Sequence, residues 1–145
     1  MLGAWLAIRG VRRTYERLNR RDVDGFLAAW AEDAVFEFPG DVAASGRFQG
    51  RAELRAWFER FLATFPSLHF TLEHVAVARP WTLGAANEVT ALWTIDLENR
   101  AGERIRNHGV TAIALRRAKV VAAKDFIFDT GPRFRRIWGE SAAPS

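Results

Sequence analysis

Residues 19–40, NRRDVDGFLAAWAEDAVFEFPG, and residues 46–65, GRFQGRAELRAWFERFLATF, decide the fold of this chain. In the first stretch a polar corner precedes an apolar face that predicts a short helix over about 23–30, and a strand over 34–38 ends at Pro39-Gly40. In the second stretch a turn leads into a helix over about 52–65. Its apolar residues recur at helical offsets and are Leu54, Trp57, Phe58, Phe61, Leu62 and Phe65.

The rest of the chain continues this order of helices before strands. A helix is predicted over about 4–19, and four strands follow over about 68–78, 87–98, 104–116 and 119–128, separated by turn signals. Helices segregated before a run of antiparallel strands predict an α+β domain over residues 1–131. In the tail, residues 132–145, the apolar residues Phe134, Ile137 and Trp138 have helical spacing. We therefore expect a short helix there, capping the pocket or a dimer edge, and a frayed end at residues 142–145.

Composition excludes several classes of protein. The 145 residues are 49% hydrophobic and 12% aromatic, which excludes a disordered chain, and no apolar run approaches the roughly 20 residues of a membrane span. The absence of Cys removes disulfides, thiol catalysis and Cys-bound zinc. The start, MLGAWLAIRG, lacks the features of a signal peptide, so a cytoplasmic protein is expected. The net charge of +4 comes from dispersed arginines without a nucleic-acid motif, so no nucleic-acid or membrane partner is expected.

Asp125 is the first candidate for acid/base chemistry. In the strand VVAAKDFIFD alternate residues share a face, which places Asp125 with Val121, Ala123, Ile127 and Asp129. A carboxylate among apolar side chains loses hydration, which raises its pKa and makes it a usable general acid or base. The alternative is a structural ion pair with an Arg or with Lys124.

Asp96 and His108 are further candidates. Asp96 ends the strand ANEVTALWTIDLE on its more polar face, where simple solvation is the alternative. His108 alternates with Ala112 and Ala114, which would leave room above them, and a neutral imidazole can exchange a proton near pH 7. A hydrogen-bonded surface histidine is the alternative. His69 and His74 fall on opposite faces of a strand, so no metal site is predicted.

Aromatic residues predict an apolar pocket. The candidates for substrate binding are Tyr15, Trp30, Phe38, Trp57, Phe58, Phe61 and Trp93, and Phe36 is a further lining candidate. This much ring surface suits a small hydrophobic ligand that bears a ring, although each of these residues could also be plain core. No phosphate loop, dinucleotide fingerprint, zinc signature or Ser-His-Asp order is present. Cofactor-free acid/base chemistry is therefore expected.

Three motifs carry a resemblance to a known family. They are N-x-x-D-x-D-G at residues 19–25, AEDAVFEFPG at 31–40 and FQGRAEL at 48–54. The chain resembles the nuclear-transport-factor-2-like superfamily, and most closely its SnoaL-like polyketide cyclase branch. The resemblance implies a cone-shaped, strongly bent antiparallel sheet wrapped around three N-terminal helices, with a central pocket. It also implies an acid/base carboxylate on the last long strand, at the position of Asp125.

Two other branches of the superfamily fit less well. Limonene-type epoxide hydrolases carry a second carboxylate that resembles Asp96, but Thr94 stands where they have an Arg, and no Tyr-x-Asn loop is present. Ketosteroid isomerases have their base where this chain has Phe38, and their acidic donor falls near Gly109 or Val110. A steroid isomerase of the known type is therefore disfavoured.

Two functional hypotheses remain open. The first is a cyclase, isomerase or hydrolase with Asp125 as acid/base and His108 or Asp96 assisting. The second is a non-catalytic binding or assembly module, which the superfamily also contains. Asp125 and His108 facing one cavity would favour catalysis. Apolar residues on both faces of segments 110–115 and 126–128 also lead us to expect a homodimer packed sheet to sheet.

Overall fold

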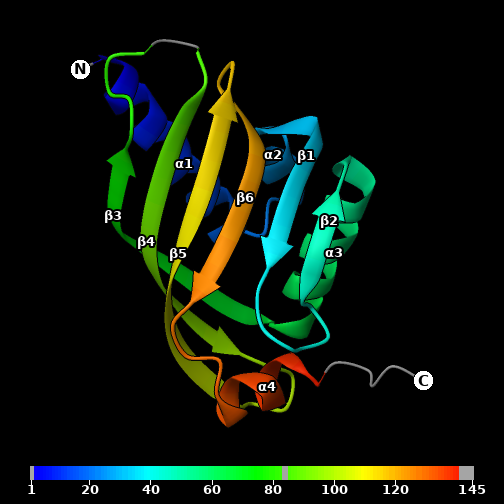
Figure 1. Cartoon of the computed structure of the whole chain (residues 1–145). Coiled ribbons are helices and arrows are strands. Elements are labelled where there is room, and N and C mark those ends of the chain that lie inside the picture. Colours follow the sequence, from blue (N-terminus) through cyan, green and yellow to red (C-terminus); the bar gives the residue numbers. More distant parts are fainter. Residues whose placement is uncertain (1, 83–84, 141–145) are drawn as a thin grey trace.

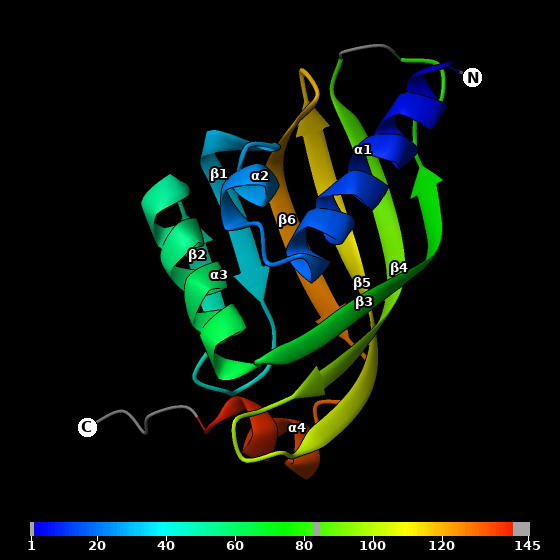
Figure 2. The same cartoon turned by 180° about the vertical axis from the view of Figure 1, so that it is seen from behind.

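A strongly curved six-stranded sheet carries helices on its concave face (Figures 1 and 2). The computed structural model describes residues 2–82 and 85–140. The helices are α1 (Leu2–Asn19), α2 (Val23–Leu27), α3 (Arg51–Thr64) and α4 (Pro132–Trp138). The strands are β1 (Trp30–Phe38), β2 (Gly46–Gln49), β3 (Ser67–Val77), β4 (Asn87–Glu98), β5 (Arg104–Arg116) and β6 (Lys119–Ile127). The predicted α+β cone with three N-terminal helices is confirmed.

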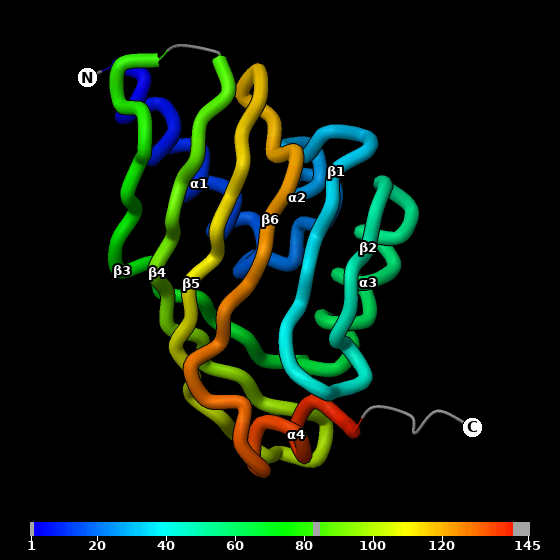
Figure 3. Tube along the Cα trace, viewed as in Figure 1, coloured from blue at the N-terminus to red at the C-terminus, as the bar shows by residue number. Residues whose placement is uncertain are grey.

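The order of strands in the sheet is β2-β1-β6-β5-β4-β3. Neighbours are antiparallel except for β1 and β6, which run parallel. The long strands β4 and β5 bend, and their lower parts curl beneath the helices toward α4 (Figure 3). We call the end of the cone with α4 the lower end, and the end with the start of α1 and the β5–β6 turn the upper end (Figure 1).

Local signals explain where the helices begin. The carboxylate of Asp22 accepts a hydrogen bond from the backbone N–H of Gly25 at 2.9 Å, which caps α2. Gly50, directly before α3, has φ of +87°, a conformation that favours glycine. The predicted apolar stripe of α3 is buried against the concave face of the sheet, at Leu54, Trp57, Phe58, Phe61 and Leu62.

The segment around Trp30 differs from the prediction. The second helix ends at Leu27, and Trp30 begins β1 instead of closing the helix. Pairing with β6 explains the change, because the N–H of Val120 donates to the carbonyl of Ala29 at 2.9 Å and Trp30 lies in register with Val120. The prediction also missed β2, whose four residues are defined by pairing with β1 rather than by their own sequence.

The C-terminal helix is present as predicted. In α4 the side chains of Phe134, Ile137 and Trp138 are buried, and the ring of Trp138 stacks on Phe61 with centroids 5.3 Å apart. The expected fraying at residues 142–145 lies outside the described residues. Within the described ranges, no helix is long and apolar enough to cross a membrane.

Candidate functional site

An internal cavity of about 80 Å³ lies between the concave face of the sheet and the helices. We call it the aromatic chamber, because half of the residues that border it are aromatic, and these come from all four helices and the sheet. All seven predicted binding residues border it: Tyr15, Trp30, Phe38, Trp57, Phe58, Phe61 and Trp93. Further rings that the prediction did not select for binding are Phe26, Phe36, Phe70, Phe134 and Trp138. Binding of a ligand by these residues stays a prediction.

Asp125 faces this chamber within a hydrogen-bonded network. The pairing of β5 with β6 places Thr111 opposite Asp125, and the Thr111 hydroxyl donates to Oδ1 of Asp125 at 2.6 Å. The same hydroxyl oxygen accepts from the Tyr15 hydroxyl at 2.9 Å and from Nε1 of Trp93 at 2.8 Å. These two donors occupy the acceptor sites of Thr111, so its single proton is directed at Asp125. We call these four residues the Thr111 network.

Burial dominates the electrostatics of Asp125. Loss of hydration raises the pKa of its carboxyl group to about 7, and the hydrogen bond from Thr111 opposes the rise. In the described parts of the chain Asp125 forms no ion pair, which removes the structural ion pair that the sequence left open. Burial and the nearby Asp125 charge also raise the pKa of Tyr15, so its phenol stays a neutral donor. The site therefore holds a carboxyl group that can gain or lose a proton near neutral pH.

The other polar groups at the chamber are few. Asn107 is fully engaged, because its Nδ2 donates to the carbonyl of Asp129 at 2.7 Å and its Oδ1 accepts from the N–H of His108 at 2.8 Å. Trp30 is buried, and its indole N–H has no hydrogen-bond partner among residues 2–82 and 85–140. An unpaired buried donor of this kind costs roughly 1–3 kcal/mol. Asp125 is the only carboxylate among the described residues that border the chamber.

The structure separates His108 and Asp96 from Asp125. Thr111 points into the cone, so His108, three residues earlier on the same strand, lies on the outer face, where it is exposed. There its Nδ1 lies 3.0 Å from the hydroxyl of Thr94, which in turn donates to Glu73.

Asp96 also lies on the outer face. It pairs with Arg106 at 2.7 Å, and this hydrogen bond lowers the pKa of Asp96. The expectation that His108 or Asp96 would share a cavity with Asp125 is therefore wrong. Among the residues that the structure describes, no group of three or more His, Asp or Glu side chains is placed to hold a metal ion.

Sequence reasoning missed Thr111 and one detail of β6. Thr111 stands between apolar neighbours on the inner face, but its role follows only from its cross-strand register with Asp125. A register shift opposite Ala114 and Leu115 makes Val120 and Ala123 border the chamber, whereas simple alternation had placed Val121 with Asp125. A bulge of this kind has no clear signal in a single sequence.

The sequence matches a family profile over most of its length. The sequence profile of the SnoaL-like domain matches residues 11–123. A search of curated proteins gives no match.

Three solved structures illustrate the similarity of fold. Bal32a, from a soil-derived mobile gene cassette, has a TM-score of 0.80 at 19% identity, over 94% of this chain and 99% of that one. An NTF2-like protein from Burkholderia pseudomallei has a TM-score of 0.77 at 20% identity, over 92% and 97%. SalBIII, described as an epoxide hydrolase/cyclase-like enzyme in pyran ring formation in salinomycin, has a TM-score of 0.71 at 18% identity, over 88% and 94%. At these identities the similarity establishes the fold.

Proposed function

This chain belongs to the SnoaL-like domain family, and from that premise we propose that it is a cofactor-independent acid/base enzyme of the cyclase or isomerase type. Its substrate would be a small hydrophobic molecule that bears a ring and binds in the aromatic chamber. One observation carries the proposal: a lone carboxyl group, with a pKa raised to about 7, faces an apolar cavity. Such a group is suited to accept and return a proton at neutral pH.

Asp125 would act first as a base and then as an acid. The carboxylate removes a proton from a carbon next to a carbonyl group, and the electron pair of that C–H bond moves onto the carbonyl oxygen. The protonated Asp125 then returns the same proton at another atom of the substrate, which completes an isomerisation or a ring closure. Thr111 holds Oδ1 at 2.6 Å, while the described contacts leave Oδ2 without a hydrogen bond and free for this exchange.

The chamber would supply the remaining requirements of the reaction. Its aromatic wall excludes water, which strengthens electrostatic interactions inside it. The unpaired N–H of Trp30 would donate to the oxygen on which negative charge develops. The similarity of fold to SalBIII, a cyclase-like enzyme by its description, is compatible with this reading.

The alternatives have less support. An epoxide hydrolase of the limonene type would need a second carboxylate, and Asp96, the candidate for that role, lies on the outer face with Arg106. A non-catalytic binding module would need only the apolar chamber. A binding module would not need the proton of Asp125. Replacing Asp125 with a residue that cannot titrate should therefore abolish the activity of an enzyme but not the ligand binding of a module.

Exchange of carbon-bound hydrogen tests the proposal. The cyclic ketone 2-tetralone is incubated in D₂O with the wild-type protein, Asp125→Asn and Asp96→Asn, and deuterium uptake is followed by NMR. We expect wild type and Asp96→Asn to accelerate uptake equally, and Asp125→Asn to lose roughly 10²–10⁴-fold of the acceleration. Equal uptake with wild type and Asp125→Asn would contradict the catalytic role of Asp125. Uptake at the buffer rate with wild type would favour the binding module.

A further inference from the structure

A second cavity lies above the aromatic chamber. It has a volume of about 220 Å³ and lies between the upper half of α1 and the upper ends of the strands, and we call it the upper cavity. Three residues, Val11, Thr14 and Val120, border both cavities. The two spaces therefore share part of their lining, which we call the shared wall.

The upper cavity is chemically apolar. None of the described residues that border it is ionisable. Its polar side chains are engaged within the protein: Nδ2 of Asn87 donates to the carbonyl of Arg79 at 2.9 Å, and Oδ1 of Asn87 accepts from the N–H of Arg79 at 3.0 Å. The hydroxyl of Thr14 donates to the carbonyl of Gly10 at 2.9 Å. A hydrocarbon chain matches this lining, whereas a charged group would lose hydration without gaining a partner.

Size and direction link the two cavities. Pockets for small molecules begin at roughly 300 Å³. Neither cavity reaches that volume alone, and the two combined do. Phe134 and Trp138 of α4, the helix at the lower end, border the chamber, whereas Val120, which borders both cavities, follows the β5–β6 turn at the upper end. A ligand beside Asp125 would therefore extend toward the upper end.

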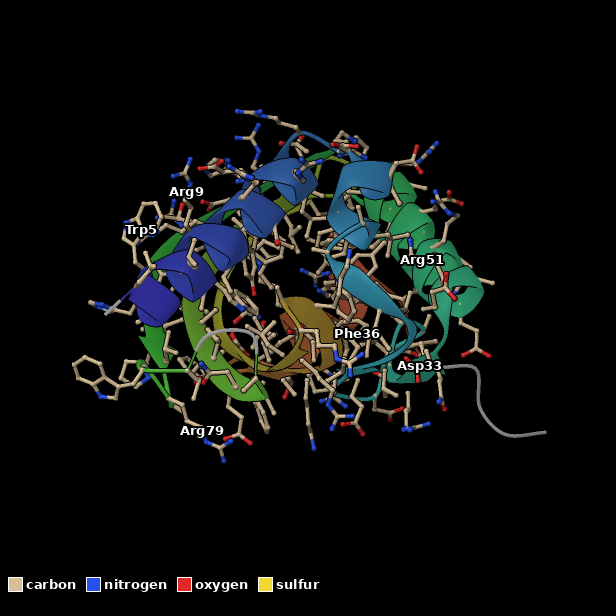
Figure 4. All side chains as sticks on the ribbon, turned by 90° about the horizontal axis from the view of Figure 1, so that it is seen from above. Trp5, Arg9, Asp33, Phe36, Arg51 and Arg79 are labelled. Carbon is tan, nitrogen blue, oxygen red and sulfur yellow. The ribbon has the colours of Figure 1, made fainter. Side chains whose placement is uncertain are left out.

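The upper end also exposes large apolar side chains. Leu6, which borders the upper cavity, is 48% exposed, and Trp5 and Trp81 are 53% and 76% exposed. Figure 4 looks onto this end and shows Trp5 and Arg9 projecting outward from α1. The start of α1 contacts the segment that carries Trp81, because the N–H of Ala4 donates to the carbonyl of Pro80 at 3.2 Å. Of these three side chains Leu6 borders the upper cavity, and exposed apolar surface of this kind is typical of a site that admits apolar ligands.

We propose that the upper cavity binds an aliphatic chain of the same ligand whose ring faces Asp125. The substrate class would then be a ring compound with an apolar extension that passes the shared wall. The inference rests on the proposed function for the position of the ring. It adds a second subsite and a requirement for length, neither of which acid/base chemistry at Asp125 demands.

Gly10 offers a way to block the upper cavity alone. It borders the cavity in the middle of α1, and a Cβ atom added there meets no heavy atom within 4 Å. Because Ala and Leu are better helix formers than Gly, neither substitution should unfold α1. Gly10→Leu would place a branched side chain at the border of the cavity, where Gly10 is exposed. Gly10→Ala is the matched control, since it changes the helix in the same way but adds one methyl group.

The probes are 4-methylphenol and 4-octylphenol, titrated by calorimetry into the wild-type protein and both variants. Each methylene that becomes buried contributes roughly a three- to fourfold gain in affinity. We expect wild type and Gly10→Ala to bind 4-octylphenol at least roughly 10²-fold more tightly than 4-methylphenol. Gly10→Leu should lose most of that difference, with a melting temperature no lower than that of wild type and an unchanged affinity for 4-methylphenol.

Three results would overturn the inference, and they separate it from the proposed function. Wild-type protein that binds both phenols equally has a ring site but no chain subsite. A preference for the octyl chain that survives in folded Gly10→Leu places the chain elsewhere. Wild-type protein that binds neither phenol contradicts both the upper subsite and the use of the chamber as a ligand site.

Discussion

Asp125→Asn should stabilise the folded protein at pH 8, and the gain should shrink as the pH falls toward 4. Asparagine keeps the shape of the side chain and the Oδ1 acceptor for Thr111, but it carries no titrating proton. In the folded protein burial raises the pKa of Asp125 from the usual 3.8 to about 7. Between these values the folded state holds a proton that the unfolded state has lost, so the wild-type free energy of unfolding decreases as the pH rises.

The magnitude follows from the size of the pKa difference. Each pKa unit corresponds to 1.36 kcal/mol, so the full difference amounts to about 4 kcal/mol at pH 8. The Asp125 side chain is only half-buried, which reduces the penalty. We therefore expect Asp125→Asn to raise the free energy of unfolding by about 2–4 kcal/mol at pH 8 and by much less at pH 5.

Urea unfolding of wild type, Asp125→Asn and Asp96→Asn at pH 5, 6, 7 and 8 measures this effect. Asp96→Asn is the control, because its effect on stability should be opposite to that of Asp125→Asn. The hydrogen bond from Arg106 lowers the pKa of Asp96, so the charged Asp96 carboxylate stabilises the folded protein at pH values above the unfolded-state pKa. Asp96→Asn should therefore be slightly less stable than wild type across this range. The reasoning is refuted if Asp125→Asn is the less stable protein at pH 8, since that result requires a partner that stabilises the charged carboxylate.

Three further changes test the Thr111 network, the role of Trp30 at the aromatic chamber and the contribution of the C-terminal helix α4. Thr111→Val leaves the Tyr15 hydroxyl and the Trp93 N–H without their acceptor, so the free energy of unfolding in urea should fall by at least about 1–3 kcal/mol. The pKa of Asp125 should rise further, because the hydrogen bond that opposes the rise is lost. An unchanged pKa would contradict the Thr111 network. Trp30→Phe should slow deuterium uptake of 2-tetralone roughly 10²-fold with little change in KM, while an unchanged rate would remove Trp30 as the donor to the oxygen. A chain that ends at Pro132 loses the buried side chains of α4, and its melting temperature should fall; equal melting would show that α4 does not close the chamber.

Local patterns predicted most of the fold. The helical offsets of α3 and the turn signals between the strands depend only on neighbouring residues, and the predicted elements differ from the structure by a few residues at most boundaries. The exceptions depend on pairing between distant segments. Strand β2 forms because it pairs with β1. Trp30 has a spacing that also fits the preceding helix, but it joins β1 because β6 provides a pairing partner.

The site was predictable to the same degree. Alternation along β6 identified Asp125, because its inner neighbours are apolar. Thr111 could not be found in this way, since its role depends on the register between β5 and β6. His108 was misplaced because a single strand does not reveal which of its two faces is the inner one. The same pairing that brings Thr111 to Asp125 places His108 on the opposite face.

The protonation of Asp125 can be measured directly by a ¹³C NMR titration of the aspartate side-chain carboxyl groups between pH 3 and 9. The Asp125 resonance is assigned by its absence from Asp125→Asn. We expect a titration midpoint near pH 7, which a half-buried carboxyl group beside an apolar cavity and held by one neutral hydroxyl should have. A midpoint near the usual value of about 4 would contradict the account, because Asp125 would then be a permanently charged carboxylate at neutral pH.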